Sequence, residues 1–143
     1  MNQSTMTGIH WSFWVIAVIT LIWNVLGAMN FVLQMNSDVI ASMGESHRAI
    51  IEGRPAWATA AFAVAVFGGA LGCILLLFKQ AVARYFFMAS LIGVLVQLLP
   101  HVDLVGSVIS DPPEILLMIV LPIVVAAFLL WYSVYCQNKR WIR

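Results

Sequence analysis

Charged side chains are the scarcest class in this sequence. Lys, Arg, Asp and Glu make up only 9% of its 143 residues, whereas soluble globular domains carry about 25%. Because 63% of the residues are hydrophobic, the polar groups are too few to cover the apolar side chains in water. This balance excludes a soluble domain. We therefore expect the lipid bilayer to be the main partner of the chain, and we expect no nucleic-acid partner.

Cysteine is scarce as well, with only Cys73 and Cys136 in the chain. Neither belongs to a CxxC motif or to a cysteine–histidine spacing typical of zinc sites, so we expect two free thiols that pack as small apolar groups. Four acidic and histidine residues of the connections are candidate metal ligands, namely His47, Glu52, His101 and Asp103. Their spacing matches no recognised metal-binding motif. We therefore expect no metal and no cofactor.

Long apolar runs are abundant. Four of them cover residues 11–35, 55–78, 84–100 and 114–136, and a transmembrane helix needs about 20 apolar residues. The charged residues lie between the runs or at their ends, as expected if a charge at the bilayer centre costs about 2.5–3.5 kcal/mol. The alternation typical of membrane β-barrels is absent. The sequence predicts an all-α polytopic membrane protein, a four-transmembrane-helix bundle that forms a single membrane domain over residues 1–143.

Basic residues are distributed unevenly between the two sides of such a bundle. If successive helices alternate in direction, five basic residues share the side that holds both chain ends, and all six acidic residues lie on the other side with two basic ones. Because Lys and Arg favour the cytoplasmic side of a membrane, we expect both termini in the cytoplasm. The five residues are Lys79, Arg84, Lys139, Arg140 and Arg143.

Glycine is concentrated in the second apolar run, although it is a poor helix former in water. Helices in lipid associate through close packing of small residues, and small residues recur here at steps of three and four, with a GxxxG pair among them. We predict that this helix packs against neighbours on more than one side through Ala61, Ala65, Gly68, Gly69 and Gly72. Whether the neighbouring helix belongs to this chain or to another copy stays open.

Uncharged polar residues recur on one face of the first and third runs. Asn30 and Gln34 lie one helical turn apart, as do Gln97 and His101. One interpretation is that these groups join helices through hydrogen bonds, which are worth about 0.6 kcal/mol each in membranes. The other is an outward-facing polar pocket for a neutral, hydroxyl-rich or amphipathic ligand. It would be built by Asn30, Gln34, Gln97 and His101, with Asp103 at its mouth.

The connection NSDVIASMGESHRAIIEGRP, residues 36–55, mixes charged residues with apolar ones at helical spacing. Asn36 or Ser37 suits the N-cap of a helix, and Gly53 suits its end. We predict one short amphipathic helix at the membrane surface, acting as an interfacial anchor or as a lid over the pocket. In the fourth run, Pro122 predicts a kink.

The segments WNVLGAMNFVLQM, PAWATAAFAVAVFGGALGCILLLF and SLIGVLVQ resemble a family of small four-helix bacterial inner-membrane proteins that are often named sugar transporters. The resemblance implies the four-helix fold and the inner (cytoplasmic) membrane. For activity it implies only the name sugar transporter, and it assigns no binding residues. The apolar runs themselves contain no carboxylate away from their ends, so they offer no group for proton-coupled transport.

Three classes of function follow from these patterns. The first is a non-enzymatic membrane protein that packs with copies of itself, as a homo-oligomer, or with a larger membrane partner. The second is a transporter or binding protein for a small, sugar-like neutral solute, which would use the outward-facing pocket. The third is a lipid- or quinone-related enzyme or redox accessory, which His101 and Asp103 would permit. We favour the first class and therefore expect no enzymatic activity.

Overall fold

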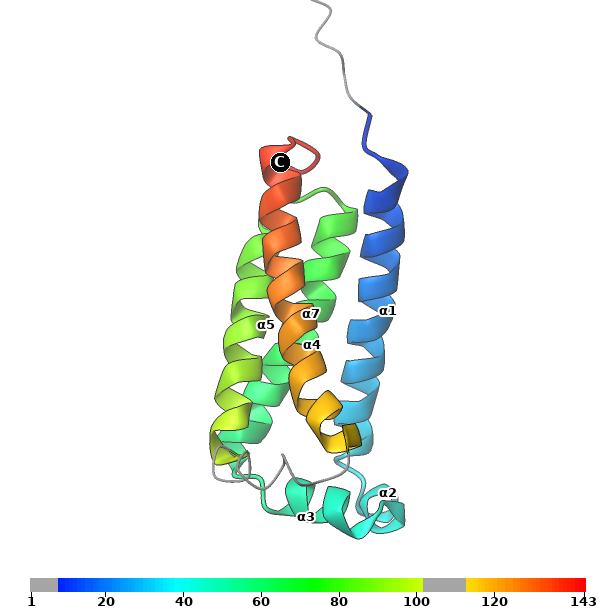
Figure 1. The fold of residues 1–143 in the computed structure, drawn as a ribbon, viewed down its shortest axis with the longest axis vertical. Coiled ribbons are helices and arrows are strands. Elements are labelled where there is room, and N and C mark those ends of the chain that lie inside the picture. Colours follow the sequence, from blue (N-terminus) through cyan, green and yellow to red (C-terminus); the bar gives the residue numbers. More distant parts are fainter. Residues whose placement is uncertain (1–7, 102–112) are drawn as a thin grey trace, which may run out of the picture.

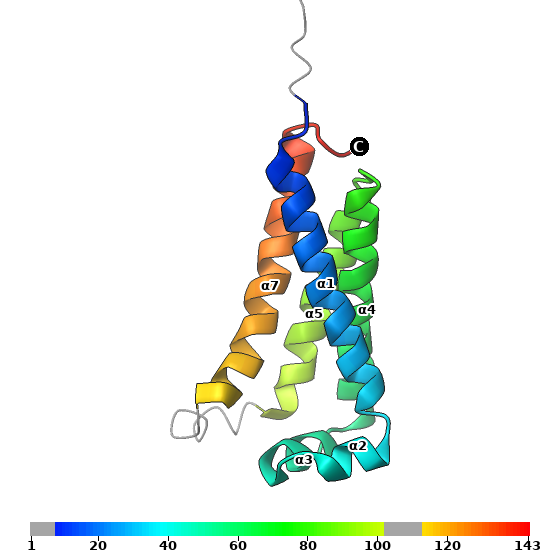
Figure 2. The same ribbon diagram turned by 90° about the vertical axis from the view of Figure 1, so that its right-hand side faces the viewer.

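The computed structural model describes residues 8–101 and 113–143, and the regular structure in these ranges is helical. Four long helices lie side by side in one bundle (Figure 1, Figure 2). They are α1 (Trp11–Leu33), α4 (Ala56–Leu77), α5 (Ala83–Leu98) and α7 (Pro113–Asn138). Two short helices, α2 (Ser37–Ser42) and α3 (Glu45–Glu52), lie across one end of the bundle, and the 3₁₀ turn η1 (Leu99–His101) follows α5.

The all-helical class is confirmed, and three helices are long and apolar enough to cross a membrane. They are α1, α4 and the part of α7 from Ile119 to Asn138. Helix α5 is apolar but has only 16 residues. It gives way to η1 near Pro100, which has no backbone N–H to continue the α-helical hydrogen bonds. The fourth predicted span therefore stays a prediction.

The connection between α1 and α4 contains two helices where the sequence analysis predicted one. Asn36 caps α2 as predicted, since its side-chain oxygen accepts hydrogen bonds from two backbone amides of the first turn, at 2.9 and 3.4 Å. Gly53 ends α3, also as predicted. The break falls at Met43 and Gly44, whose backbones are extended. Glycine has a low helix propensity and so favours a break at this point.

Helix α1 begins and α7 ends at the same end of the bundle, here called the terminal end; the opposite end is the α2–α3 end (Figure 1). Both α4 and α7 stop at the terminal end with a basic residue in the left-handed region, Lys79 at φ 60° and Arg140 at φ 58°. In each case the next N–H donates to the carbonyl five residues earlier, at 2.9 Å. This is a Schellman arrangement, which usually employs glycine. A cation there lies close to the negative end of the helix dipole.

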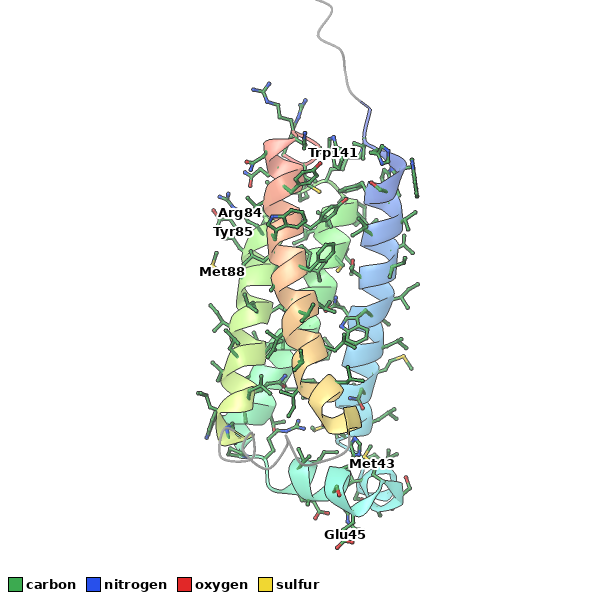
Figure 3. The ribbon with its side chains drawn as sticks, in the orientation of Figure 1. Met43, Glu45, Arg84, Tyr85, Met88 and Trp141 are labelled. Carbon is green, nitrogen blue, oxygen red and sulfur yellow. The ribbon has the colours of Figure 1, made fainter. Side chains whose placement is uncertain are left out.

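The chain beyond α7 returns across the terminal end and ties it together. The N–H of Arg143 donates to the carbonyl of Lys79 at 2.9 Å, and the carbonyl of Arg143 accepts from the N–H of Ala81 at 2.8 Å. Trp141, seen at this end in Figure 3, meets the Phe13 ring edge-on with centroids 6.3 Å apart. These contacts join α1, the α4–α5 connection and α7 where the helices end.

Opposite charges gather at opposite ends of the bundle. The terminal end holds the five basic residues that the sequence analysis assigned to one side, and Arg84 and Glu45 mark the two ends in Figure 3. Three acidic residues precede α4 in the described ranges, and all of them lie at the α2–α3 end: Asp38, Glu45 and Glu52. Arg48 and Arg54 lie at the same end. The alternating helix directions on which the orientation argument rests are therefore present.

Glycines allow close contacts between α4 and α5, the pair of helices that pack most extensively. A Cβ atom on Gly93 would lie 2.7 Å from the carbonyl oxygen of Ala61, which is too close for any real contact. A Cβ atom on Gly72 would lie 2.6 Å from the Phe87 ring, whereas one on Gly68 would lie 3.4 Å from its nearest neighbour, an ordinary contact. Of the GxxxG pair, only Gly72 has to be glycine for reasons of space.

The predicted small-residue face of α4 is shared between two neighbouring helices. Ala65 is 3% exposed, and Ala61 is half-buried; both contribute backbone atoms that approach Gly93 of α5. Gly69 instead faces Asn24 of α1. Helix α4 is thus packed on more than one side by helices of this same chain.

Helices α1 and α7 are not among the closely packed pairs of the described structure. They approach each other at the terminal end and diverge toward the α2–α3 end (Figure 2). A large apolar cluster fills the terminal end, with Phe13, Leu76, Phe87 and Leu129 as its largest fully buried side chains. The second buried cluster has small and medium-sized members only, namely Ala65, Val94 and Ala126. The bundle is therefore filled most completely at its terminal end.

Candidate functional site

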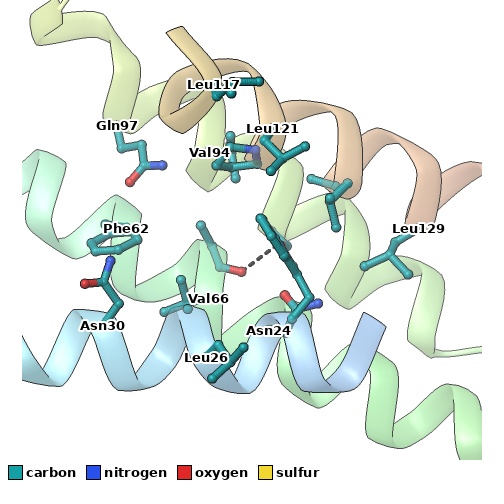
Figure 4. Close-up of a pocket in the computed structure, with 17 residues that line it drawn as sticks. Asn24, Leu26, Asn30, Phe62, Val66, Val94, Gln97, Leu117, Leu121 and Leu129 are labelled. Carbon is teal, nitrogen blue, oxygen red and sulfur yellow. Dashed lines mark hydrogen bonds between the residues drawn. The ribbon is translucent and has the colours of Figure 1, made fainter. Parts of the chain in front are cut away.

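A cavity of about 390 Å³ lies between α1, α4, α5 and α7, and residues of all four helices line it (Figure 4). Its walls are mainly aliphatic, with Trp23 and Phe62 as aromatic members. Four polar side chains reach it from α1 and α5, and none of the described residues that line it carries a charge. The four are Asn24, Asn30, Ser90 and Gln97.

Asn24 is the most constrained of these polar groups. Its Nδ2 donates to the carbonyl of Thr20 at 2.8 Å and lies 3.6 Å from Cys73 Sγ. The thiol of Cys73 in turn lies 3.7 Å from the Thr20 hydroxyl. A Cβ atom on Gly69 would meet Cγ of Asn24 at 2.8 Å, so the amide sits in the space that the absent side chain leaves. Asn24 therefore packs against α4 at Gly69 and Cys73, while its shortest hydrogen bond stays within α1.

Ser90 joins α5 to α4 in a similar way. Its hydroxyl donates to the carbonyl of Ala65 at 2.6 Å. This carbonyl belongs to the helical segment that Gly93 allows to come close. The hydroxyl proton is therefore already engaged, and only the lone pairs of the oxygen are open to a ligand in the cavity.

Asn30 and Gln97 differ from these two residues because their amides have no hydrogen-bond partner in the part of the chain that the structure describes. Both side chains lie near Phe62 on one side of the cavity (Figure 4). Each amide provides two donors and one acceptor group. They are thus the polar side chains of the wall whose donors are all left for a bound molecule.

Arg54 lies next to this group of residues without lining the cavity itself. Its Cζ is 5.1 Å from the centre of the Phe62 ring, a distance at which a cation is attracted to the ring face. Burial lowers the pKa of the guanidinium, which still stays protonated at neutral pH. The side chain is half-buried, and no ion pair with a described carboxylate accompanies the ring contact.

The cavity brings together only part of the predicted pocket. Asn30 and Gln97 line it, whereas Gln34 does not. Gln34 is 8% exposed at the end of α1, and its Oε1 has no partner among the described residues. The backbone of His101 belongs to η1, but its side chain and the whole of Asp103 lie outside what the structure describes.

Two polar residues of the wall, Asn24 and Ser90, were not among the predicted site residues. The sequence contained a signal for each, since Asn24 precedes Gly27 and Asn30 at steps of three, and Ser90 precedes Gly93 by three. The step of seven residues from Ser90 to Gln97 places these two on the same helix face, whereas Asn24 and Asn30 each share a face with Gly27. The four-residue step to Gln34 carried the prediction one turn too far toward the end of α1.

The described residues contain no group of three His, Cys, Asp or Glu side chains that could hold a metal ion. Comparison with known proteins adds no further constraint: the sequence matches no protein-family model, and no curated protein or solved structure is significantly similar to it. The resemblance to small four-helix inner-membrane proteins therefore stays a prediction.

Proposed function

We propose that this chain is a four-span membrane protein that binds a single-chain amphipathic lipid in the cavity between its long helices. Three of its helices have the length and apolar composition of spans. Helix α5 and η1 together run without a break from Ala83 to His101, which is close to the about 20 residues that a span needs. The proposal includes the bacterial inner membrane as the compartment.

The distribution of charge supports an orientation with the terminal end in the cytoplasm. That end carries Lys79, Arg84 and the three basic residues at and beyond the end of α7. The α2–α3 end carries acidic residues and only two basic ones before α4. By the preference of Lys and Arg for the cytoplasmic side, both ends of the chain face the cytoplasm, and the α2–α3 end faces the outer side.

The composition of the cavity wall supports an amphipathic ligand. Binding sites for small molecules typically have volumes of about 300–1,000 Å³ and apolar walls with a few polar groups that fix orientation, and this cavity of about 390 Å³ has that character. A sugar would need a partner for each of its hydroxyls, because burying an unpaired one costs about 1–3 kcal/mol. Asn30 and Gln97 are too few for that, so the wall favours a molecule with one polar end.

Lining residues that also reach the outer surface support a ligand that comes from the bilayer. Two of them, on α1 and α7, are large, apolar and exposed, with Leu26 at 56% and Leu117 at 58%. Between them the two helices diverge (Figure 2). In a membrane these side chains would face lipid tails, so a lipid chain could enter sideways without crossing water.

The size of the cavity limits the ligand further. A volume of about 390 Å³ corresponds to roughly a dozen water molecules at about 30 Å³ each. This is room for one hydrocarbon chain or one ring with a short tail, and too little for both chains of a phospholipid. Packing with further copies or with a larger membrane partner is compatible with such binding and stays a prediction from the sequence.

Photo-labelling of the purified protein in lipid vesicles tests the proposal. The probe is a long-chain fatty alcohol with a diazirine near the end of its chain. We expect the probe to label Val94 and Ala126. These residues line the cavity and are only 4% and 6% exposed, so bulk lipid does not reach them. Labels found only on outward-facing residues such as Ile19, which is 60% exposed, would contradict the proposal.

Variants of the two free amides connect the labelling to the cavity. Gln97→Leu and Asn30→Leu each remove a hydrogen-bonding group worth about 0.5–1.5 kcal/mol, so labelling of Val94 should fall by about two- to tenfold. Gln80→Leu is the matched control because Gln80 is exposed in the connection between α4 and α5 at the other end of the bundle. Equal labelling in all of these variants would show that the amides do not hold the probe.

A further inference from the structure

Arg54 has an unusual position for a cation in this chain. It lies at the α2–α3 end, in the connection directly before α4, and it is half-buried. Its one described interaction is with the face of the Phe62 ring, at 5.1 Å. Among the described side chains no carboxylate pairs with it, and a partly desolvated guanidinium without such a pair is costly compared with a paired one. An anion brought by a ligand would therefore be stabilised at this position.

The Phe62 ring links this cation to the cavity. Phe62 lines the cavity, and the free amides of Asn30 and Gln97 lie on either side of it in Figure 4. The guanidinium thus lies over a ring that itself forms part of the cavity wall. Farther along, the wall consists of apolar residues such as Val94, Ala126 and Leu129. The site therefore has one polar, positively charged end and one apolar end.

We propose that the ligand is a lipid with an ionised carboxylate head, of the fatty acid class. Its chain occupies the apolar part of the cavity, its carboxylate accepts hydrogen bonds from the amides of Asn30 and Gln97, and the positive charge of Arg54 beside the Phe62 ring attracts it. Charge-assisted hydrogen bonds of this kind are stronger than neutral ones, and Arg is well suited to carboxylates. This inference rests on the proposed function, since it specifies the head group of the molecule in the same cavity.

Arg48 provides a matched control for Arg54. It lies in α3 at the same end of the bundle and is also half-buried, but it has no described ring contact with a residue of the cavity wall. A general attraction of anionic lipids to basic residues at this end would depend on both side chains. A head-group site would depend on Arg54 far more than on Arg48.

The experiment compares a photoreactive fatty acid with the fatty alcohol of the same chain and diazirine position, in vesicles of a neutral phospholipid and in alkaline buffer so that the acid is ionised. We expect the acid to label Val94 and Ala126 more efficiently than the alcohol does. Arg54→Gln should lower labelling by the acid about tenfold and leave labelling by the alcohol unchanged. Arg54→Lys should recover part of the loss, and Arg48→Gln should have little effect.

The outcomes separate this inference from the proposed function. If neither probe labels Val94 and Ala126 in the native chain, the proposed function fails and the inference fails with it. If the acid and the alcohol label equally, and Arg54→Gln changes neither, the cavity binds a chain but Arg54 does not select its head group. If Arg48→Gln lowers labelling by the acid as much as Arg54→Gln does, surface charge explains the effect and the head-group site is refuted.

Discussion

Replacing Gly93 by alanine tests the packing between α4 and α5 most directly. The added Cβ atom would lie 2.7 Å from the carbonyl oxygen of Ala61 and 2.9 Å from the backbone nitrogen of Ala65. Both neighbours are backbone atoms of α4, so no side-chain rotation can relieve the contact. Because ordinary contacts begin near 3.4 Å, the two helices would have to separate by about 0.7 Å at this point.

The separation has two energetic consequences. Over-packing of a tight interior typically costs about 1–3 kcal/mol. The hydrogen bond from the Ser90 hydroxyl to the Ala65 carbonyl, now 2.6 Å long, would also lengthen, and such a bond contributes about 0.5–1.5 kcal/mol. Against these losses stands the better helix propensity of alanine, worth about 0.5–1 kcal/mol. We therefore expect Gly93→Ala to lower the free energy of unfolding by about 1–3 kcal/mol.

Gly68→Ala is the matched control because Gly68 belongs to the same α4–α5 interface, with its nearest neighbour 3.4 Å from the added Cβ atom. There the propensity gain is not opposed by a clash, so stability should stay the same or rise by up to about 1 kcal/mol. Unfolding by SDS in mixed micelles, followed by tryptophan fluorescence, measures both variants. The reasoning is refuted if Gly93→Ala is as stable as Gly68→Ala.

Three further predictions concern other contacts of the bundle. Gly69→Ala should lower the free energy of unfolding by about 1–3 kcal/mol, and adding Asn24→Ala should recover part of this loss. Simple additivity in the double-mutant cycle would mean that the two residues do not compete for space. Arg140→Gly should raise stability by about 1 kcal/mol relative to Arg140→Ala, because φ is 58° at this position; equal unfolding midpoints would argue against backbone strain there. Ile142→Ala should cost about 2 kcal/mol or more, since Ile142 is 2% exposed, whereas Leu99→Ala, at a residue 59% exposed, should change the unfolding midpoint little.

The helices themselves could be predicted from the sequence because their signals are local. Runs without charge are long enough for helices α1, α4 and α7, and the punctuating residues Asn36 and Gly53 mark where short helices begin and end. The break between α2 and α3 was missed, since the apolar spacing continues across Gly44. A glycine within a periodic pattern can be tolerated or can end a helix, and the pattern alone does not distinguish the two.

The candidate site could be predicted only in part. Asn30 and Gln97 were found because polar residues in apolar runs are rare and stand out. Asn24 and Ser90 stood out equally, but the sequence did not indicate that their faces turn toward the same cavity. Arg54 gave no signal at all, because its contact with Phe62 joins a connection to the side of a helix.

Composition and charge spacing by themselves determined that this chain forms long apolar helices with charges at their ends, since both depend only on neighbours along the chain. Tertiary structure alone decided which glycines are indispensable. Gly68 and Gly69 are adjacent in sequence, yet one has ordinary room beside α5 and the other makes space for Asn24 of α1. Tertiary structure also decided that a cavity exists, because helices α1, α4, α5 and α7 line it together. The spacing of helices that are far apart in sequence is a tertiary property, and no local pattern encodes it.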